Sequence, residues 1–494
     1  MYKTGVHFYV NIKNLIDIIK EEADKDDDLK RTLHRLQTYF TGFTTLIGLY
    51  GGIVEKYTSG RAHVYFNVDE DNKEDAIENI LKTVVACIYY NNKIFNELSK
   101  YKQYSYPDFK VHAGVDYGDF IEYEIEDDIN DTEFTTVGAV ANNSAKIQSY
   151  AKQNYIYILD RFYNELSSSL QDKFVELTED EKKNIKGKIK NSKIYKAHYN
   201  NIFDEEKMNE LEEELKDVKT KVEGEAKKLN ITEITFEGAR AKLDFNGLSL
   251  SGKNKKFTAG VLCADIRGFT KLFNKSDNNL EDLFDVMTEI YDIMGQTVNE
   301  YEGTKAQYQG DRIVAVFHDF TGSSDYVIRL LKSAFALNEK IQKLNSREDI
   351  QEKLGNKNIA IGIGCSTGDI IATRLGAKGN KDNIILGEVV LNADNCEDRY
   401  AEKNNTVINK AFKYMIKDKT DIVEYEVLNE VFSSISTTSY YKTSTTLSDF
   451  NNDVNKKKED KLKNLQKSIL SATPIISSAS GEKIQGAPRP WGDF

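Results

Sequence analysis

The chain has 494 residues, of which 40% are hydrophobic and 30% are charged, and its formal net charge is −12. This length is enough for two or three domains, and the hydrophobic share argues against wholesale disorder. The negative charge argues against a general nucleic-acid-binding surface, which needs a basic footprint.

The cysteines and the N-terminus bear on the cellular compartment. The four cysteines are scattered and form no CxxC pair, which favours a reducing compartment over a disulfide framework or a zinc site. The first residues lack the basic-then-apolar layout of a signal peptide, and no stretch approaches about 18 uninterrupted apolar residues. We therefore expect a cytoplasmic protein without membrane contact.

The first 200 residues alternate strands with longer helices. A strand is predicted over residues 5–12, and apolar residues at helical spacing predict a helix over 28–50 that ends at Gly51 and Gly52. Two β-rich runs separated by a turn-like segment then predict a hairpin. The remaining elements are the hairpin strands near 53–57 and 62–67, a helix near 74–99, a strand in FKVHAGVDYG, a strand-turn-helix unit near 134–151, and an end near His198.

The same order of elements recurs from residue 257 to about residue 427. The segment FTAGVLCADIRGFTKLF matches GVHFYVNIKNLIDII of the first half, and EGTKAQYQGDRIVAVF matches GGIVEKYTSGRAHVYF. A repeat of this size indicates one structural unit used twice. Because strands and helices are mixed in this order, we expect an α+β fold of two tandem domains.

The segment 203–229 differs from both repeats because it is heavily charged. Apolar residues recur in it at helical spacing, which predicts an exposed connecting helix, with a coiled-coil seam as the alternative. The apolar stripe consists of Leu211, Leu215, Val218 and Val222.

The end of the chain is Ser/Thr-rich, then basic and helical near 453–469, and then polar. This last part holds three of the four prolines and the only tryptophan, so it is predicted to be disordered. Trp491 and Phe494 are typical of a docking peptide, and an end without function is the alternative. The expected domains are residues 1–200, a charged helical linker over 201–250, residues 251–430, and a basic helix with a disordered tail over 431–494.

Two aspartates are the first candidates for a functional site. Asp265 ends an apolar strand, and Asp311 follows Gly310 at the tip of the second hairpin. Neighbouring strand ends would bring the two carboxylates together, and a hard divalent cation is the usual reason to keep such a pair. The alternative is two turn aspartates that accept hydrogen bonds from backbone amides. The first half has Asn11 and Arg61 at the positions that match by sequence.

The segments ADIRGFT and YQGDRIVAVF resemble the two metal-binding motifs of class III nucleotidyl cyclases, and the resemblance covers most of the chain. It implies two ferredoxin-like α/β sandwich domains, similar to the polymerase palm, that pair with each other and form active sites between them. It also implies cyclisation of a nucleoside triphosphate with release of pyrophosphate. Asp265, Asp311 and the carbonyl of Ile266 would hold two divalent cations, Mg²⁺ or Mn²⁺.

In this family the partner domain supplies an Asn and an Arg from one helix, spaced as G-x-x-x-N-x-x-x-R. The first half has Gly138, Asn142 and Lys146 in this spacing, so Asn142 would orient the ribose and Lys146 would stand in for the arginine. The alternatives are a helix cap and a solvated lysine. The second half has Leu391 and Asn395 at these positions, which predicts one competent site per chain.

The resemblance also implies which residues read the base. Purine cyclases carry Lys or Glu four residues before the second-aspartate position, where the two halves have Tyr57 and Gln307, and the second base-reading position is Thr135. With a tyrosine at this position, the sequence resembles the pyrimidine cyclases of bacterial antiphage defence (Pycsar), which make cyclic UMP or cyclic CMP. UTP and CTP both stay open, with a slight preference for UTP. The alternative for Tyr57 is an ordinary strand aromatic.

The sequence leaves open the role of Lys305 and two alternative functions. Lys305 lies six residues before Asp311 and is either a phosphate-binding residue or a surface lysine. An adenylate cyclase with an atypical pocket is the first alternative function. A catalytically silent, nucleotide-sensing scaffold is the second, because Lys146 replaces the arginine.

Overall fold

The computed structural model describes residues 2–23, 29–103, 106–126, 132–185, 188–228, 230–268 and 280–472. The first half builds one mixed sheet with helices against it. Its elements are β1 (Tyr2–Ile12), α1 (Leu15–Ala23), α2 (Lys30–Leu49), β2 (Ile53–Thr58), β3 (Arg61–Asn67), α3 (Lys73–Tyr89), α4 (Ser99–Gln103), β4 (Val111–Glu126), β5 (Thr132–Val137), α5 (Ala139–Tyr150), β6 (Tyr155–Leu159), α6 (Asp160–Tyr163), α7 (Ser168–Gln171), β7 (Val175–Glu176), α8 (Glu179–Lys182) and β8 (Ile194–His198).

A helical connection and a second sheet follow. The elements are α9 (Glu205–Glu214), α10 (Lys216–Lys228), β9 (Phe236–Glu237), β10 (Asn254–Arg267), α12 (Leu280–Glu300), β11 (Thr304–Gln309), β12 (Arg312–Phe317), α13 (Tyr326–Leu344), α14 (Glu348–Lys353), β13 (Ala360–Ala377), β14 (Asn380–Leu386), α15 (Glu388–Asn395), the π-helical turn η6 (Cys396–Tyr400), β15 (Asn405–Asn409), α16 (Lys410–Lys417), α17 (Val423–Val431), β16 (Ser433–Ser434), β17 (Tyr440–Thr443) and α18 (Leu447–Ala472).

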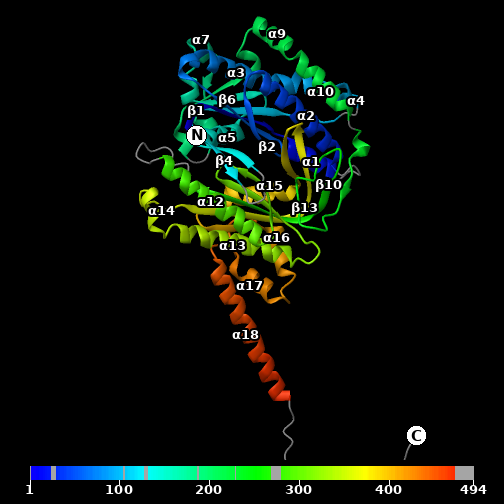
Figure 1. Ribbon diagram of the computed structural model, residues 1–494, viewed down its shortest axis with the longest axis vertical. Helices are drawn as coiled ribbons and strands as arrows, with labels where there is room; N and C mark the ends of the chain where they lie inside the picture. The colour runs from blue at the N-terminus through cyan, green and yellow to red at the C-terminus, as the bar shows by residue number, and fades with distance from the viewer. Residues whose placement is uncertain are drawn as a thin grey trace, which may run out of the picture.

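The two sheets have the same topology. The first runs β2-β3-β1-β4-β6-β8-β7 and the second runs β11-β12-β10-β13-β15-β17-β16, with β5 and β14 attached at matching places on β4 and β13. The two units lie against each other, the first half above the second in Figure 1. The predicted fold class, an α+β fold of two tandem cyclase-type domains, is therefore confirmed.

Strand alternation explains how each sheet divides its side chains between core and interface. In β1, Val6, Phe8 and Val10 are at most 2% exposed and belong to the core of the first half. Successive strand residues point to opposite faces. Tyr9 and Asn11 therefore lie on the other face, where they line cavities shared with the second half.

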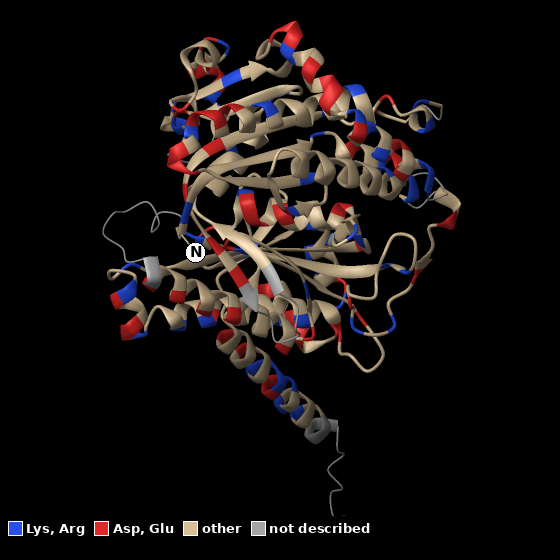
Figure 2. Cartoon of the chain, turned by 45° about the horizontal axis from the view of Figure 1, so that its top comes forward, with Lys and Arg blue, Asp and Glu red and all other residues tan. Residues whose placement is uncertain are grey.

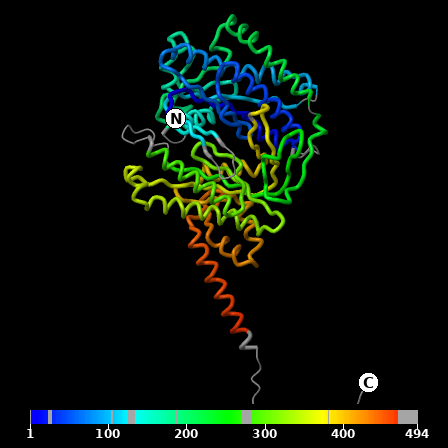
Figure 3. The backbone as a smooth tube through the Cα atoms, in the orientation of Figure 1, coloured from blue at the N-terminus to red at the C-terminus, as the bar shows by residue number. Residues whose placement is uncertain are grey.

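Each half also sends a hairpin arm into the other. Leu375 and Ile384 of the β13–β14 arm are buried in the core of the first half, and Tyr123 of the β4–β5 arm is buried in the core of the second. The arm of the second half reaches the helix α2, where Gln37 bonds both backbone groups of Gly376, donating to O at 2.9 Å and accepting from N at 3.1 Å. The yellow strands beside the blue helices in Figures 1 and 3 show this exchange. The exchange fixes the register in which the two halves meet.

The connection between the halves is not the exposed helix that its composition predicts. Its apolar stripe, Leu211 to Val222, is at most 1% exposed and belongs to the core of the first half. Val222 packs close to Gly42 of α2. Figure 2 shows the charged residues of α9 and α10 along the upper edge of the molecule. The stripe therefore adds a helical layer to the first domain.

The second sheet continues past residue 430, the boundary expected from composition. Strand β17 pairs with β15 in an antiparallel register, and α18 begins at Leu447, before the helix expected near residue 453. Phe450 and Val454 anchor this helix in the core of the second half, and the rest of it projects from the body in Figure 1. Residues 473–494, with the aromatic docking peptide, lie outside the described residues. No helix among the described residues is long and apolar enough to cross a membrane.

One glycine sets how closely the helix α5 approaches β4. A Cβ added at Gly114 would lie 2.4 Å from the backbone N of Gln148 and 2.5 Å from the carbonyl O of Ser144. We expect Gly114→Ala to push α5 away and to destabilise the protein by about 3 kcal/mol, because the backbone atoms of α5 cannot move away from the added Cβ without shifting the helix. Urea unfolding measures this, and the control is Gly224→Ala, whose Cβ meets nothing within 4 Å. Equal effects of both variants would contradict the close-packing argument.

Candidate active site between the two halves

A cavity of about 370 Å³ lies between the halves and takes residues from both. The second half contributes Asp265, Ile266 and Asp311, and the first half contributes Asn142 and Lys146. The structure therefore brings together the five residues that the resemblance assigns to metal binding and to the transition state.

The pairing of β10 with β12 places the two aspartates side by side. Asp265 lies opposite Arg312 in the strand register, and the backbone N of Ile266 donates to the carbonyl O of Asp311 at 3.3 Å. Burial, and after it the neighbouring carboxylate of Asp311, raises the pKa of Asp265, and burial also raises the pKa of Asp311. Two acids that hinder each other's ionisation suit a divalent cation, so the donor set fits the two-cation site.

Residues that the sequence analysis missed surround this pair. Arg267 donates to Asp265 at 2.7 Å and also pairs with Glu397, while Arg312 pairs with Asp394 at 2.6 Å. Burial and the nearby Asp265 raise the pKa of Glu397 to about 8. The arginines follow the aspartates closely in sequence and could have been noticed. The position of Glu397 depends on the π-helical turn η6, which no sequence motif predicts.

Lys146 is exposed on α5 and faces the aspartates across the cavity. Its positive charge lowers the pKa of both Asp265 and Asp311, against the larger effect of burial. Asn142 lies one turn earlier on the same face, since residues four apart are neighbours on a helix. One helix of the first half thus presents both groups to the acids of the second half.

The hairpin registers correct the alignment of the two halves by one residue. Asn11 pairs with Arg61 in the first sheet as Asp265 pairs with Arg312 in the second. Arg61 therefore corresponds to Arg312, and Gly60 is the counterpart of Asp311. The position four residues before the second aspartate is then Lys56 in the first half. It remains Gln307 in the second.

Tyr57 does not reach the cleft, so the prediction that it reads the base is wrong. Its side chain is 0% exposed, its ring stacks on Phe40 at 4.0 Å, and its hydroxyl donates to the carbonyl O of Phe40 at 3.1 Å. Tyr308 takes the matching place in the second half, where its hydroxyl donates to the carbonyl O of Tyr291 at 3.1 Å. Both tyrosines are core residues because strand alternation turns them toward the helices.

Lys56 and Gln307 instead reach across the interface in matching ways. Lys56 Nζ donates to the carbonyl O of Tyr308, and Gln307 Nε2 donates to the carbonyl O of Tyr57 at 2.8 Å. An irregularity in the pairing of β2 with β3 lies between Val54 and Lys56. It lets both Glu55 and Lys56 line the cleft.

A second cavity of about 760 Å³ continues the cleft, and its walls share Glu55 and Lys56 with the first. Thr135 lies in this second cavity, fully buried, and donates to Glu55 Oε1 at 3.1 Å. Lys305 also lines the second cavity rather than the first, so it stands apart from the aspartates. The phosphate-binding role considered for Lys305 therefore has no support from its position.

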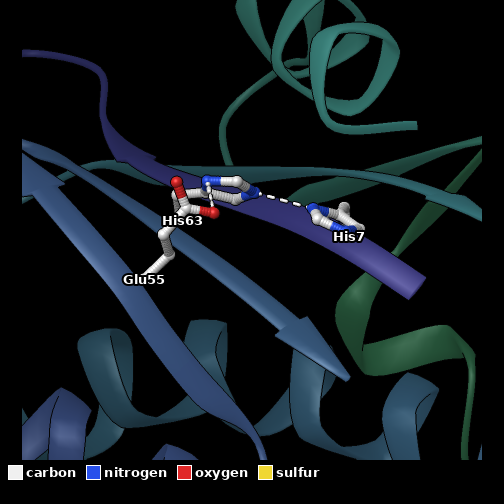
Figure 4. A group of neighbouring side chains, drawn as sticks. All are labelled: His7, Glu55 and His63. Atoms are coloured by element: carbon white, nitrogen blue, oxygen red, sulfur yellow. Dashed lines mark hydrogen bonds and ion pairs between the residues drawn. The ribbon is translucent and has the colours of Figure 1, made fainter. Parts of the chain in front are cut away.

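Glu55 belongs to a buried row of titratable groups that the sequence analysis did not identify. Its Oε2 lies 2.9 Å from His63 Nδ1, and His63 Nε2 lies 2.9 Å from His7 Nδ1 (Figure 4). Burial opposes ionisation of Glu55, but His63, Lys56 and a hydrogen bond from Thr136 outweigh it and lower the pKa of Glu55 to about 2. Burial lowers the pKa of His7 well below its ordinary value, so His7 is neutral at pH 7.

The lowered pKa of Glu55 predicts a pH-dependent contribution to stability. An acid whose pKa is lower in the folded state stabilises that state above its unfolded pKa of 4.5 and loses this effect as the pH falls toward 2. We expect wild type to exceed Glu55→Gln by about 3 kcal/mol in unfolding free energy at pH 6, and by much less at pH 3. Urea unfolding at both pH values measures the difference. A difference independent of pH would contradict the lowered pKa.

The pseudo-symmetric position in the same interface has different chemistry. A cavity of about 190 Å³ there is lined by Asn11, Gly60, Arg61 and Leu391, together with apolar side chains of α1. Asn11 and Gly60 take the places of the two aspartates, and Leu391 takes the place of Asn142. This cavity therefore lacks the donor set of the first, and a single competent site per chain stays a prediction.

Known proteins resemble both the sequence and the structure. Residues 253–433 match the family described as adenylate and guanylate cyclase catalytic domain. The chain is 25% identical over 409 residues to a uridylate cyclase of Pseudomonas aeruginosa, which covers 79% of this chain and 74% of that protein. It is 28% identical over 131 residues to an adenylate cyclase of Anabaena cylindrica, 26% of this chain and 25% of that protein.

Among solved structures, a class III adenylyl cyclase-like ATP-binding protein from Pseudomonas aeruginosa superposes with a TM-score of 0.72. That match has 18% identity and covers 92% of this chain and 90% of the other, so it shows a shared fold over both halves. Residues 253–433 therefore match an adenylate and guanylate cyclase catalytic domain, in agreement with the predicted resemblance, and both halves share the fold of a class III cyclase-like protein.

Proposed function

We propose that this protein is a nucleotidyl cyclase that converts a pyrimidine nucleoside triphosphate, UTP before CTP, to its 3′,5′-cyclic monophosphate and pyrophosphate. The observation that carries the proposal is the relation to a uridylate cyclase. Its 409 aligned residues exceed either half of this chain and so span both, whereas the adenylate cyclase relative aligns over 131 residues. A role of the product as a second messenger in antiphage defence rests on the Pycsar resemblance.

The residues of the cleft suit this reaction. Asp265, Asp311 and the carbonyl of Ile266 would hold two divalent cations, Mg²⁺ or Mn²⁺, which supply charge neutralisation at the triphosphate and a lower pKa for the ribose 3′-hydroxyl. The 3′-oxygen bonds to the α-phosphorus as the bond to pyrophosphate breaks. Asn142 would orient the ribose, and Lys146 would stabilise the negative charge that develops on the transferred phosphoryl group.

One observation favours adenylate cyclase as a second candidate. With the corrected register, Lys56 occupies the position at which the family resemblance assigns lysine to adenylate cyclases. Because Tyr57 lies in the core, it gives no reason to exclude a purine base. The choice between the two candidates then depends on the base that the cleft accepts.

A nucleotide panel tests the proposal. Purified protein is incubated with ATP, GTP, CTP or UTP and with Mn²⁺ or Mg²⁺, and the products are identified by mass. We expect cyclic UMP as the main product, its loss on addition of EDTA, and its return with excess Mn²⁺, because the paired acids need the cation. Cyclic AMP as the main product would establish the second candidate. No product from any nucleotide would favour the silent scaffold.

A further inference from the structure

The row Glu55–His63–His7 has apolar counterparts in the second half. The sheet registers match Glu55 with Ala306, His63 with Val314, and His7 with Val261. These three counterparts belong to an ordinary apolar cluster. The fold therefore accepts small apolar residues at all three places. Burying a carboxylate and two imidazoles there costs desolvation free energy, even with the hydrogen bonds that join them, so the row points to a role other than packing.

The row ends at the cleft, where Glu55 is the member that lines both cavities and His63 lines the cavity of the aspartates alone. Glu55 lines both cavities, while the irregularity in β2 turns it away from the core. His63 stacks on Tyr9, at 4.1 Å between ring centres, and Tyr9 lines the cavity of the aspartates. Lys56 lies beside Glu55 in both walls. A carboxylate and an ammonium group thus stand together where the two cavities join.

The hydrogen bonds of Glu55 leave it one acceptor position. Oε2 accepts from Thr136 and from His63, and Oε1 accepts from Thr135. A carboxylate offers about four acceptor positions, so three donors among the described residues leave one on Oε1. The lowered pKa keeps this group ionised, and therefore an acceptor only, at neutral pH.

We propose that Glu55 is the residue that reads the nucleobase, by accepting the N3–H of uracil while Lys56 donates to the adjacent carbonyl oxygen. This inference rests on the proposed pyrimidine cyclase function and names its specificity determinant. Uracil presents a ring N–H between two carbonyl oxygens, which an acceptor beside a donor matches. Neutral cytosine has an unprotonated N3 and does not offer that donor. Thr135, Thr136 and His63 are positioning residues that hold the carboxylate toward the base.

The first test is Glu55→Ala, which installs the residue of the second half. Steady-state kinetics with UTP and with CTP are compared in the full chain. We expect kcat/KM for UTP to fall about 100-fold while that for CTP changes less than about tenfold, because only uracil loses an acceptor for its ring N–H. A purely structural Glu55 would lower both values equally, and that result would overturn the proposal.

A second variant, Glu55→Gln, keeps the test informative if Glu55→Ala does not fold. In Glu55→Gln, His63 and Thr136 favour the amide oxygen on their side, so the amide N–H faces the base. We expect the ratio of CTP to UTP kcat/KM to rise further than in Glu55→Ala, since a donor now meets N3 of cytosine. His63→Val, the residue of the second half, should shift the ratio in the same direction by about tenfold, because the carboxylate loses its support. An unchanged ratio in all three variants overturns the proposal.

The outcome separates this inference from the proposed function. If wild-type protein makes cyclic UMP and the Glu55 variants keep its preference for UTP, the function stands and the role of Glu55 fails. If wild-type protein makes cyclic AMP and no cyclic UMP, the proposed function fails, and the assignment of uracil to Glu55 fails with it.

Discussion

Replacing Asp265 by asparagine is expected to lower the rate of cyclisation at least about 1,000-fold. The change keeps the shape of the side chain but removes one of two adjacent carboxylates, and with it the charge that would hold the cations. Cations of this kind contribute several kcal/mol to transition-state stabilisation, and about 1.4 kcal/mol corresponds to a factor of ten in rate. Product formation from UTP with saturating Mn²⁺ measures the effect, and titration with Mn²⁺ measures the loss of binding.

The chain supplies its own control for this variant. The first half carries Asn11 at the position of Asp265, so the strand accepts asparagine there and Asp265→Asn should unfold at the same urea concentration as wild type. The reverse change, Asn11→Asp, places an acid near Gly60 of the first hairpin, where the second hairpin has Asp311, and should add no activity. Cyclisation that survives in Asp265→Asn would refute the metal assignment.

Much of this architecture follows from patterns that sequence carries directly. The repeated order of strands and helices predicts two like domains, and the ends of β10 and of the second hairpin predict adjacent aspartates, because strand ends and turns are fixed by local residue preferences. The spacing of Asn142 and Lys146 on one helical face has the same local origin. These features do not depend on how the halves pack, so they can be predicted.

The hairpin register could not be predicted in this way. A shift of one residue moves every side chain of a strand to the opposite face, and the two hairpin tips, SGR and GDR, differ too much in sequence to fix the alignment. An alignment of the two hairpins that is off by one residue assigns Tyr57 to the pocket in place of Lys56. The irregularity at Glu55 further departs from regular strand alternation, because an extra residue on one strand changes the direction in which the neighbouring side chains point.

Features that depend on tertiary packing were also missed. The apolar stripe of the connection reads as exposed because charged residues surround it, yet α2 offers a surface that buries it. Glu397 reaches the aspartates only because α15 ends in a π-helical turn. The crossed hairpin arms form where the two halves pack against each other. The residue pattern of one strand does not predict that packing. These contacts join segments that are far apart in the sequence, and sequence periodicity does not predict which segments meet.

Removing the positive charge of Lys146 is expected to lower kcat about 100-fold with little change in KM. Lys146 is exposed in the cleft and acts electrostatically on both aspartates, so under the proposed function its ammonium group would stand where negative charge grows during phosphoryl transfer. A group that acts chiefly on the transition state changes kcat more than substrate binding. Steady-state kinetics of Lys146→Ala with UTP measure the split between the two constants.

Two further variants decide whether charge alone is required at this position. Lys146→Arg keeps the charge and adds a planar, two-pronged donor, so it should retain or exceed wild-type kcat. Asn395→Lys places a lysine at the matching position of the second half, at the end of α15, and should leave activity unchanged. If Lys146→Ala raised KM and spared kcat, Lys146 would bind the ground-state triphosphate instead, and the single competent site would rely on the cations and Asn142 for its rate.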